Sequence, residues 1–150
     1  MITHNDLIDY ISRSTVIAVS IVIPTNIASL AIAYFLTSDQ ARTDMLDILI
    51  ILLALVAIAD IAVAFVLKRK SLTPILDVDG RPDAPILWQA ILKISILIGA
   101  LCSTVPLYGL VLTFLGAGIE VAVGFSLASL IGFMLLRVRP RDFEKLNIGV

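Results

Sequence analysis

Four long apolar blocks, separated by polar segments, dominate the chain. A helix needs about 20 apolar residues to cross the roughly 30 Å hydrocarbon layer of a bilayer. The blocks run from Val16 to Leu36, Ile48 to Leu67, Ile94 to Leu115 and Ile119 to Leu136. Because lipid cannot satisfy backbone polar groups, each block must be a helix, and the alternating ten-residue strands of a membrane barrel are not seen in the sequence. We therefore predict an all-α polytopic protein, with a single membrane domain over residues 1–150 and four transmembrane helices.

Composition narrows the functional classes. The chain is 59% apolar and 15% charged, with a mean hydropathy of +1.05, whereas soluble domains are roughly 45–50% apolar and about 25% charged. With 11 Lys and Arg against 12 Asp and Glu, no basic patch is long enough to bind nucleic acid. Cys102 and His4 are the only residues of their types, so we expect no disulfide, metal site or cofactor.

The distribution of basic residues predicts the orientation, because Lys and Arg mark the cytoplasmic side of a membrane protein. Arg13 precedes the first span, and Arg42 is the one basic residue in the opposite loops, Thr37–Asp47 and Gly116–Gly118. The other basic residues lie in the loop 68–93 or after the fourth span: Lys68, Arg69, Lys70, Arg81, Lys93, Arg137, Arg139, Arg141 and Lys145. We expect a bacterial inner (plasma) membrane protein with both termini and loop 68–93 in the cytoplasm.

Two segments allow a second interpretation. Small residues at Ala31 and Ala33 resemble a signal-peptide cleavage site, but the apolar stretch continues beyond them through Leu36. The sequence from Asp77 to Asp83 resembles the start of a calcium loop, because alternating carboxylates before a glycine can converge on a cation. Position twelve of that loop is Trp88 instead of a bidentate Glu, so an Asp/Gly/Pro turn is favoured.

Asp60 is the one ionisable residue deep inside a predicted span. The depth of a residue in the membrane follows from its distance along the span, at 1.5 Å per residue. By this measure, polar side chains of the other three spans lie in one layer with Asp60: Asn26, Ser103, Ser126 and Ser129. We expect Asp60 to face the bundle interior and to bond to some of these groups, since an unpaired carboxyl facing lipid is costlier. It is then either a proton or ion relay or a polar peg that fixes helix register.

Small residues recur at helical spacing in the third and fourth spans. The third carries Ser95, Gly99, Cys102, Ser103, Pro106, Gly109 and Thr113, and the fourth carries Gly124, Ala128 and Gly132. Small residues let helix backbones approach closely where lipid gives no hydrophobic drive, so both stripes predict packing faces, filled by this chain or by another copy. Pro24 and Pro106 each free a backbone carbonyl inside a span. We expect the four helices to form two tandem helical hairpins.

The segment from Gly99 to Val111, with Pro106-Leu107-Tyr108-Gly109-Leu110-Val111 at its end, resembles the second helix of the proteolipid c subunit of rotary ATP synthases. That family has a carboxylate shortly before the Tyr, at the position of Ser103 here. The layout is also similar to uncharacterised bacterial four-span proteins that carry this c-like segment. The resemblance implies shared helix packing; the chain lacks the family's polar Arg-Gln-Pro loop and its glycine ladder, and its predicted orientation is inverted.

These observations predict a non-enzymatic membrane protein. No Ser/His/Asp set, Cys/His pair or Gly-rich phosphate loop is found in the sequence, and such groups are what an enzyme site needs. We expect an accessory or structural subunit of a membrane assembly, or a homo-oligomer, whose partners are lipid, other membrane subunits or copies of itself. The alternative is a proteolipid-like proton or ion pathway component that uses Asp60.

Overall fold

The computed structural model describes residues 4–36, 44–76 and 84–143, and within them the chain is almost entirely helical. Four α-helices, α1 (His4–Leu36), α2 (Asp44–Leu76), α3 (Ala84–Phe114) and α4 (Ile119–Leu136), are followed by a short 3-10 helix, η1 (Pro140–Phe143). Each α-helix is long and apolar enough to cross a membrane. The prediction of an all-α, four-helix architecture is confirmed, and the protein is a multi-pass integral membrane protein.

Three of the helices extend well beyond the predicted spans at one end of the bundle. α1 begins at His4, α2 continues to Leu76, and α3 begins at Ala84, so most of the predicted loop 68–93 is helical. The apolar blocks identify only the part of a helix that lies in hydrocarbon, whereas helices continue into the headgroup layer. The calcium-loop-like segment, 77–83, lies outside the described residues.

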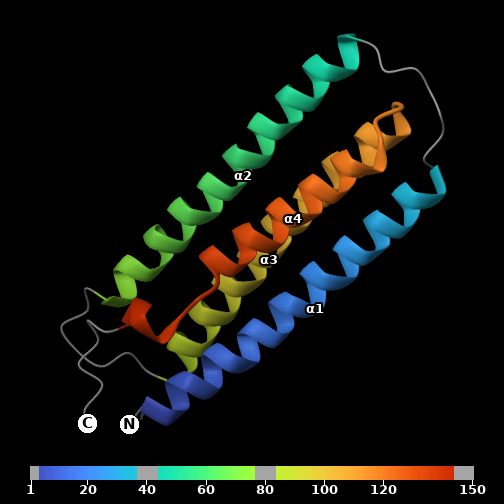
Figure 1. Ribbon diagram of the computed structural model, residues 1–150. Coiled ribbons are helices and arrows are strands. Elements are labelled where there is room, and N and C mark those ends of the chain that lie inside the picture. The colour runs from blue at the N-terminus through green and yellow to red at the C-terminus, as the bar shows by residue number, and fades with distance from the viewer. Residues whose placement is uncertain (1–3, 37–43, 77–83, 144–150) are drawn as a thin grey trace.

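α3 is the central helix of the bundle, because it packs against α1, α2 and α4. Figure 1 shows α1 and α2 on opposite sides of the α3/α4 pair, with the start of α1 and η1 at the same end. Half of the α3 span is buried within the chain but only 11% of the α2 span. α2 therefore presents most of its apolar surface to its surroundings.

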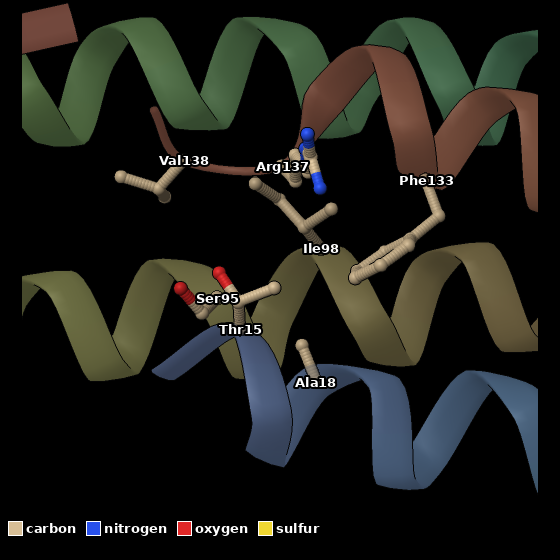
Figure 2. A pocket seen from close by; sticks show the side chains of 7 residues that line it. All are labelled: Thr15, Ala18, Ser95, Ile98, Phe133, Arg137 and Val138. Atoms are coloured by element: carbon tan, nitrogen blue, oxygen red, sulfur yellow. The ribbon is translucent and has the colours of Figure 1, made fainter. Parts of the chain in front are cut away.

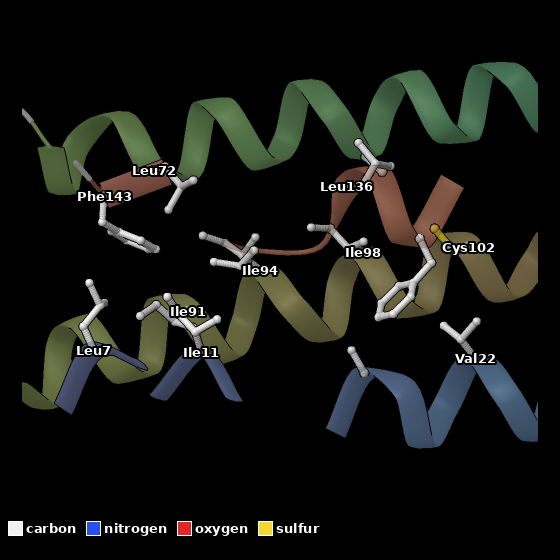
Figure 3. Packing of buried hydrophobic residues seen from close by; sticks show 14 of the residues in the cluster. Leu7, Ile11, Val22, Leu72, Ile91, Ile94, Ile98, Cys102, Leu136 and Phe143 are labelled. Atoms are coloured by element: carbon white, nitrogen blue, oxygen red, sulfur yellow. The ribbon is translucent and has the colours of Figure 1, made fainter. Parts of the chain in front are cut away.

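The buried side chains form two apolar clusters, one toward each end of the bundle. The basic-end cluster joins the first turns of α1 and α3 to the end of α4 and to Phe143 of η1 (Figure 3); it includes Leu7, Ile11, Leu72, Leu87, Ile91, Ile94, Ile98, Leu136, Val138 and Phe143. The turn-end cluster contains Leu46, Ala57, Val105, Leu112, Ala117 and Phe125. Phe143 is 2% exposed, so the segment after α4 is part of the core.

A tight glycine turn connects α3 and α4. Gly116 has φ 97°, the left-handed conformation in which glycine avoids the steric cost of a Cβ. The Ala117 N–H donates to Leu112 O at 2.9 Å and the Gly116 N–H to Thr113 O at 3.0 Å, the paired bonds of a Schellman cap. This cap turns the chain sharply and sets α4 antiparallel against α3.

Three of the four predicted packing glycines lie in close contacts between helices. A Cβ added at Gly109 would be 2.8 Å from Ala122 Cα, one at Gly99 would be 3.4 Å from Ala18, and one at Gly132 would be 3.1 Å from Ile61 Cδ1. A Cβ added at Gly124 would meet nothing within 4 Å. The small-residue stripe of α3 is therefore used inside the chain, whereas the stripe of α4 is used only in part.

Candidate functional site: the intramembrane carboxyl of Asp60

Asp60 is the middle residue of α2, and its carboxyl is hydrogen-bonded to two hydroxyls of α3. Tyr108 Oη lies 2.6 Å from Asp60 Oδ2, and Thr104 Oγ1 lies 3.2 Å from the same oxygen. The neighbouring buried residues of α2 belong to different clusters, with Ala57 in the turn-end cluster and Ala64 in the basic-end cluster. The carboxyl thus occupies the junction between the two apolar clusters and joins α2 to α3.

The hydroxyl hydrogens allow this site to hold the carboxyl in either charge state. Thr104 has one hydroxyl hydrogen, and its oxygen also lies 2.7 Å from Leu101 O. If that hydrogen goes to Leu101 O, the Thr104 oxygen can accept a bond from protonated Asp60. If Asp60 is ionised, Thr104 and Tyr108 can both donate to it. One rotation of the Thr104 hydroxyl therefore accompanies gain or loss of the proton.

Two of the expected partners, Asn26 and Ser129, form a separate polar chain. Asn26 Nδ2 donates to Ser129 Oγ at 3.2 Å and to Val22 O at 2.8 Å, and Ser129 Oγ donates to Cys102 O at 2.7 Å. Cys102 is four residues before Pro106, which has no N–H to donate to that carbonyl. Ser129 thus donates a hydrogen bond to the carbonyl that Pro106 leaves without its usual donor. These hydrogen bonds join α1, α4 and α3.

The remaining residues of the expected layer, Ser103 and Ser126, do not bond to Asp60 either. Ser103 Oγ donates to Gly99 O of its own helix at 2.8 Å. Ser126 Oγ is buried without a hydrogen-bond partner among the described residues. Ser95, on the predicted packing face, donates to Ser14 Oγ of α1 at 3.1 Å. The polar residues that we predicted to form a single layer are therefore divided between two sites. One site surrounds Asp60, and the other contains Asn26 and Ser129.

A shallow apolar groove of about 370 Å³ runs between α2 and α4, beside the Asp60 site. Its lining is Ile50, Ala54, Ala57, Ile58, Ile61, Val121, Gly124, Phe125 and Ala128. The Phe125 ring lies edge-on to the Tyr108 ring, with 6.5 Å between centroids. Phe125 therefore separates the groove from the hydroxyl that bonds to Asp60.

The sequence analysis missed Thr104 and Tyr108 as partners of Asp60, although one signal was present. The two residues are four apart, so their hydroxyls lie on one face of α3. Both are partly buried, which is how a helix presents a polar group to a neighbour. A pair of hydroxyls at that spacing, opposite the stripe of small residues, could have been read as a site for a carboxyl on another helix.

Comparison with known proteins adds no assignment. No protein-family model, no curated protein and no solved structure matches the chain.

Proposed function

We propose that this integral membrane protein is a non-enzymatic subunit that assembles, in a bacterial inner membrane, with the transmembrane helices of other subunits or of its own copies. The observation that carries the proposal is the α2/α4 groove. Four of its lining residues are small, namely Ala54, Ala57, Gly124 and Ala128. Small residues at a lipid-facing surface allow another helix to approach closely, which is how helices associate in membranes.

Gly124 gives the groove its depth without any role in the chain's own packing. It is exposed, and an added Cβ would meet nothing within 4 Å. Glycine has one of the lowest helix propensities, so its presence in α4 costs stability that intrachain packing does not return. An approaching partner helix would supply the missing contacts.

The test is the mass of the native particle, extracted in mild detergent and measured by native mass spectrometry, with identification of every accompanying chain. The wild-type particle should exceed the 16.2 kDa of one chain. Gly124→Leu fills the groove and should release the partners. Ala62→Leu, at an exposed position of α2 outside the groove, is the matched control and should retain them. A wild-type particle of one chain, or a Gly124→Leu particle of unchanged mass, would overturn the proposal.

A second candidate function rests on the Asp60 site, which would make the protein a proton or ion pathway component. Intramembrane carboxyls commonly mark proton or ion routes. Both hydroxyl contacts go to Oδ2, and the residue is partly exposed. The hydroxyl rearrangement at Thr104 allows the carboxyl to be protonated or ionised with its partners still in contact.

Asp60→Asn separates this function from a purely structural role. The asparagine oxygen, placed where Oδ2 lies, can accept from both Tyr108 and Thr104, but the amide cannot release a proton as a carboxyl does. The full-length protein, in whatever assembly it is extracted, is reconstituted into vesicles. Proton uptake driven by a potassium diffusion potential is then followed with a pH-sensitive dye. The pathway predicts uptake by wild type and by Asp60→Glu, and none by Asp60→Asn at unchanged particle mass. Equal uptake by wild type and Asp60→Asn would contradict it.

A further inference from the structure

A second groove lies at the basic end of the bundle, where the chain leaves α4 and crosses the start of α1. Its volume is about 300 Å³, and one wall is the α1 face formed by Ile11, Ser12, Thr15 and Val16. The other wall is the segment 137–140, which includes Arg137, Val138, Arg139 and Pro140. The groove is therefore apolar at Ile11, Val16 and Val138, and polar or cationic at the hydroxyls and guanidinium groups.

The groove narrows into a cleft between α1, α3 and the end of α4, and the two hollows share Thr15, Arg137 and Val138. Figure 2 shows this cleft, with Arg137 and Phe133 from the α4 side, Thr15 and Ala18 from α1, and Ser95 and Ile98 from α3. The cleft is too narrow to hold a water molecule. It closes the inner side of the groove, so a ligand would enter from the membrane surface.

Two described carboxylates near this groove are paired with lysine or arginine side chains outside it. Asp142 is paired with Lys68 at 2.8 Å and also accepts the Arg139 backbone N–H at 2.8 Å, and Asp9 is paired with Arg13 at 2.9 Å. In the described part of the chain, neither Arg137 nor Arg139 has a carboxylate within ion-pairing distance. An anion would therefore complete the charge balance of the groove.

The segment that carries the two arginines is held in place by the rest of the bundle. Arg139 Nη2 donates to Met134 O at 2.8 Å, and Lys68 Nζ donates to Arg137 O at 3.2 Å. Val138 is 3% exposed and is part of the basic-end cluster. The Arg137 side chain remains exposed on a backbone fixed by α2, so its guanidinium is available to a ligand.

We propose that this groove binds the phosphodiester headgroup of an anionic phospholipid. Arg137 and Arg139 follow the last turn of a membrane-spanning helix, at the depth of the lipid headgroups, and guanidinium groups pair well with phosphate oxygens. Ser12 and Thr15 supply hydroxyls for the glycerol region, while the exposed Val16 lies where an acyl chain begins. Basic pockets between transmembrane helices are suited to such headgroups. The inference is independent of the proposed assembly function.

Native mass spectrometry of the full-length protein, titrated with one lipid at a time, gives the Kd of the first bound lipid. Dioleoyl phosphatidylglycerol is the anionic probe, dioleoyl phosphatidylcholine the zwitterionic control, and glycerol 3-phosphate the soluble phosphate. Phosphatidylglycerol should bind more tightly than phosphatidylcholine. Arg137→Gln should weaken phosphatidylglycerol binding by about fivefold, the ratio expected for one basic side chain at an anionic surface, and Arg137→Lys should retain most of it.

Arg141→Gln is the matched control, because it removes the same charge from an exposed position at the same end, outside the groove. It should leave the Kd nearly unchanged. Three results would overturn the proposal. They are equal affinity for the two lipids, an equal loss for Arg141→Gln, or displacement of phosphatidylglycerol by glycerol 3-phosphate at matching concentration, which would indicate a soluble ligand.

Discussion

Replacing Ser129 with alanine tests whether its hydroxyl compensates for the proline in α3. The Ser129 hydroxyl donates to Cys102 O at 2.7 Å and accepts from Asn26 at 3.2 Å, and Ser129 is fully buried. Ser129→Ala leaves the carbonyl without a donor, because Pro106 has no N–H. In a Pro106→Ala background, the new backbone N–H can donate to the carbonyl, and the same substitution should cost less.

The magnitude follows from the number of bonds lost. A hydrogen bond between membrane helices is worth about 0.6 kcal/mol on average and up to about 1.7 kcal/mol. Ser129→Ala loses two such bonds in the natural chain, so we expect a loss of about 1–2 kcal/mol in the free energy of unfolding. With Pro106→Ala present, only the bond from Asn26 is lost, and the cost should fall to about 0.6 kcal/mol.

The assay is equilibrium unfolding of the wild type, the two single variants and the double variant by sodium dodecyl sulfate in mixed micelles. Trp88 is the only tryptophan, and its ring lies 5.3 Å from that of Tyr10 across the α1/α3 contact, so its fluorescence reports on the packing of these helices. Circular dichroism gives an independent measure of helix content. Additive costs, with Ser129→Ala equally damaging in both backgrounds, would refute the coupling between Ser129 and Pro106.

Two further predictions concern packing and the end of the chain. Gly109→Ala should lower the free energy of unfolding by about 1–3 kcal/mol, because its Cβ would lie 2.8 Å from Ala122 Cα. Gly124→Ala is the control, because an added Cβ there meets nothing within 4 Å; it should leave the free energy of unfolding nearly unchanged or raise it. The same detergent titration measures both variants. Lys68→Gln removes the pair with Asp142 and should speed trypsin cleavage after α4 in detergent, whereas an unchanged cleavage rate would show that the pair does not hold that segment.

The number and type of elements follow from the sequence because lipid admits few backbone structures. An apolar block of sufficient length must be helical, so Val16–Leu36 and the three later blocks predict the four helices. The ends of the helices were not predicted in the same way. The helical extension from Lys68 to Leu76 contains charged residues, and hydropathy gives no signal for a helix that leaves the hydrocarbon.

Depth in the membrane was a poor guide to hydrogen-bond partners, because hydroxyl side chains can bond within their own helix. Thr25 Oγ1 donates to Ile21 O, Ser103 Oγ to Gly99 O and Thr113 Oγ1 to Gly109 O. Such bonds to a preceding carbonyl are available to any serine or threonine in a helix. A hydroxyl at the depth of Asp60 is therefore not evidence of a contact, and the rotation of each helix is needed as well.

The rotation of α3 could have been inferred from its small residues, and it explains the partners of Asp60. Successive residues of a helix are turned by about 100°, which places Ser103 about 40° from Gly99, and Thr104 and Tyr108 roughly opposite Gly99. Gly99 lies against Ala18 of α1, so Ser103 is turned toward the α1 side and away from α2. The opposite face is left for α2, and it carries the two hydroxyls that meet the carboxyl. The sequence does not show which helix the glycine face of α3 would contact, because a stripe of small residues can pack against any helix. Once α1 is known to pack against that face, helix geometry places Thr104 and Tyr108 on the opposite face, toward Asp60 of α2.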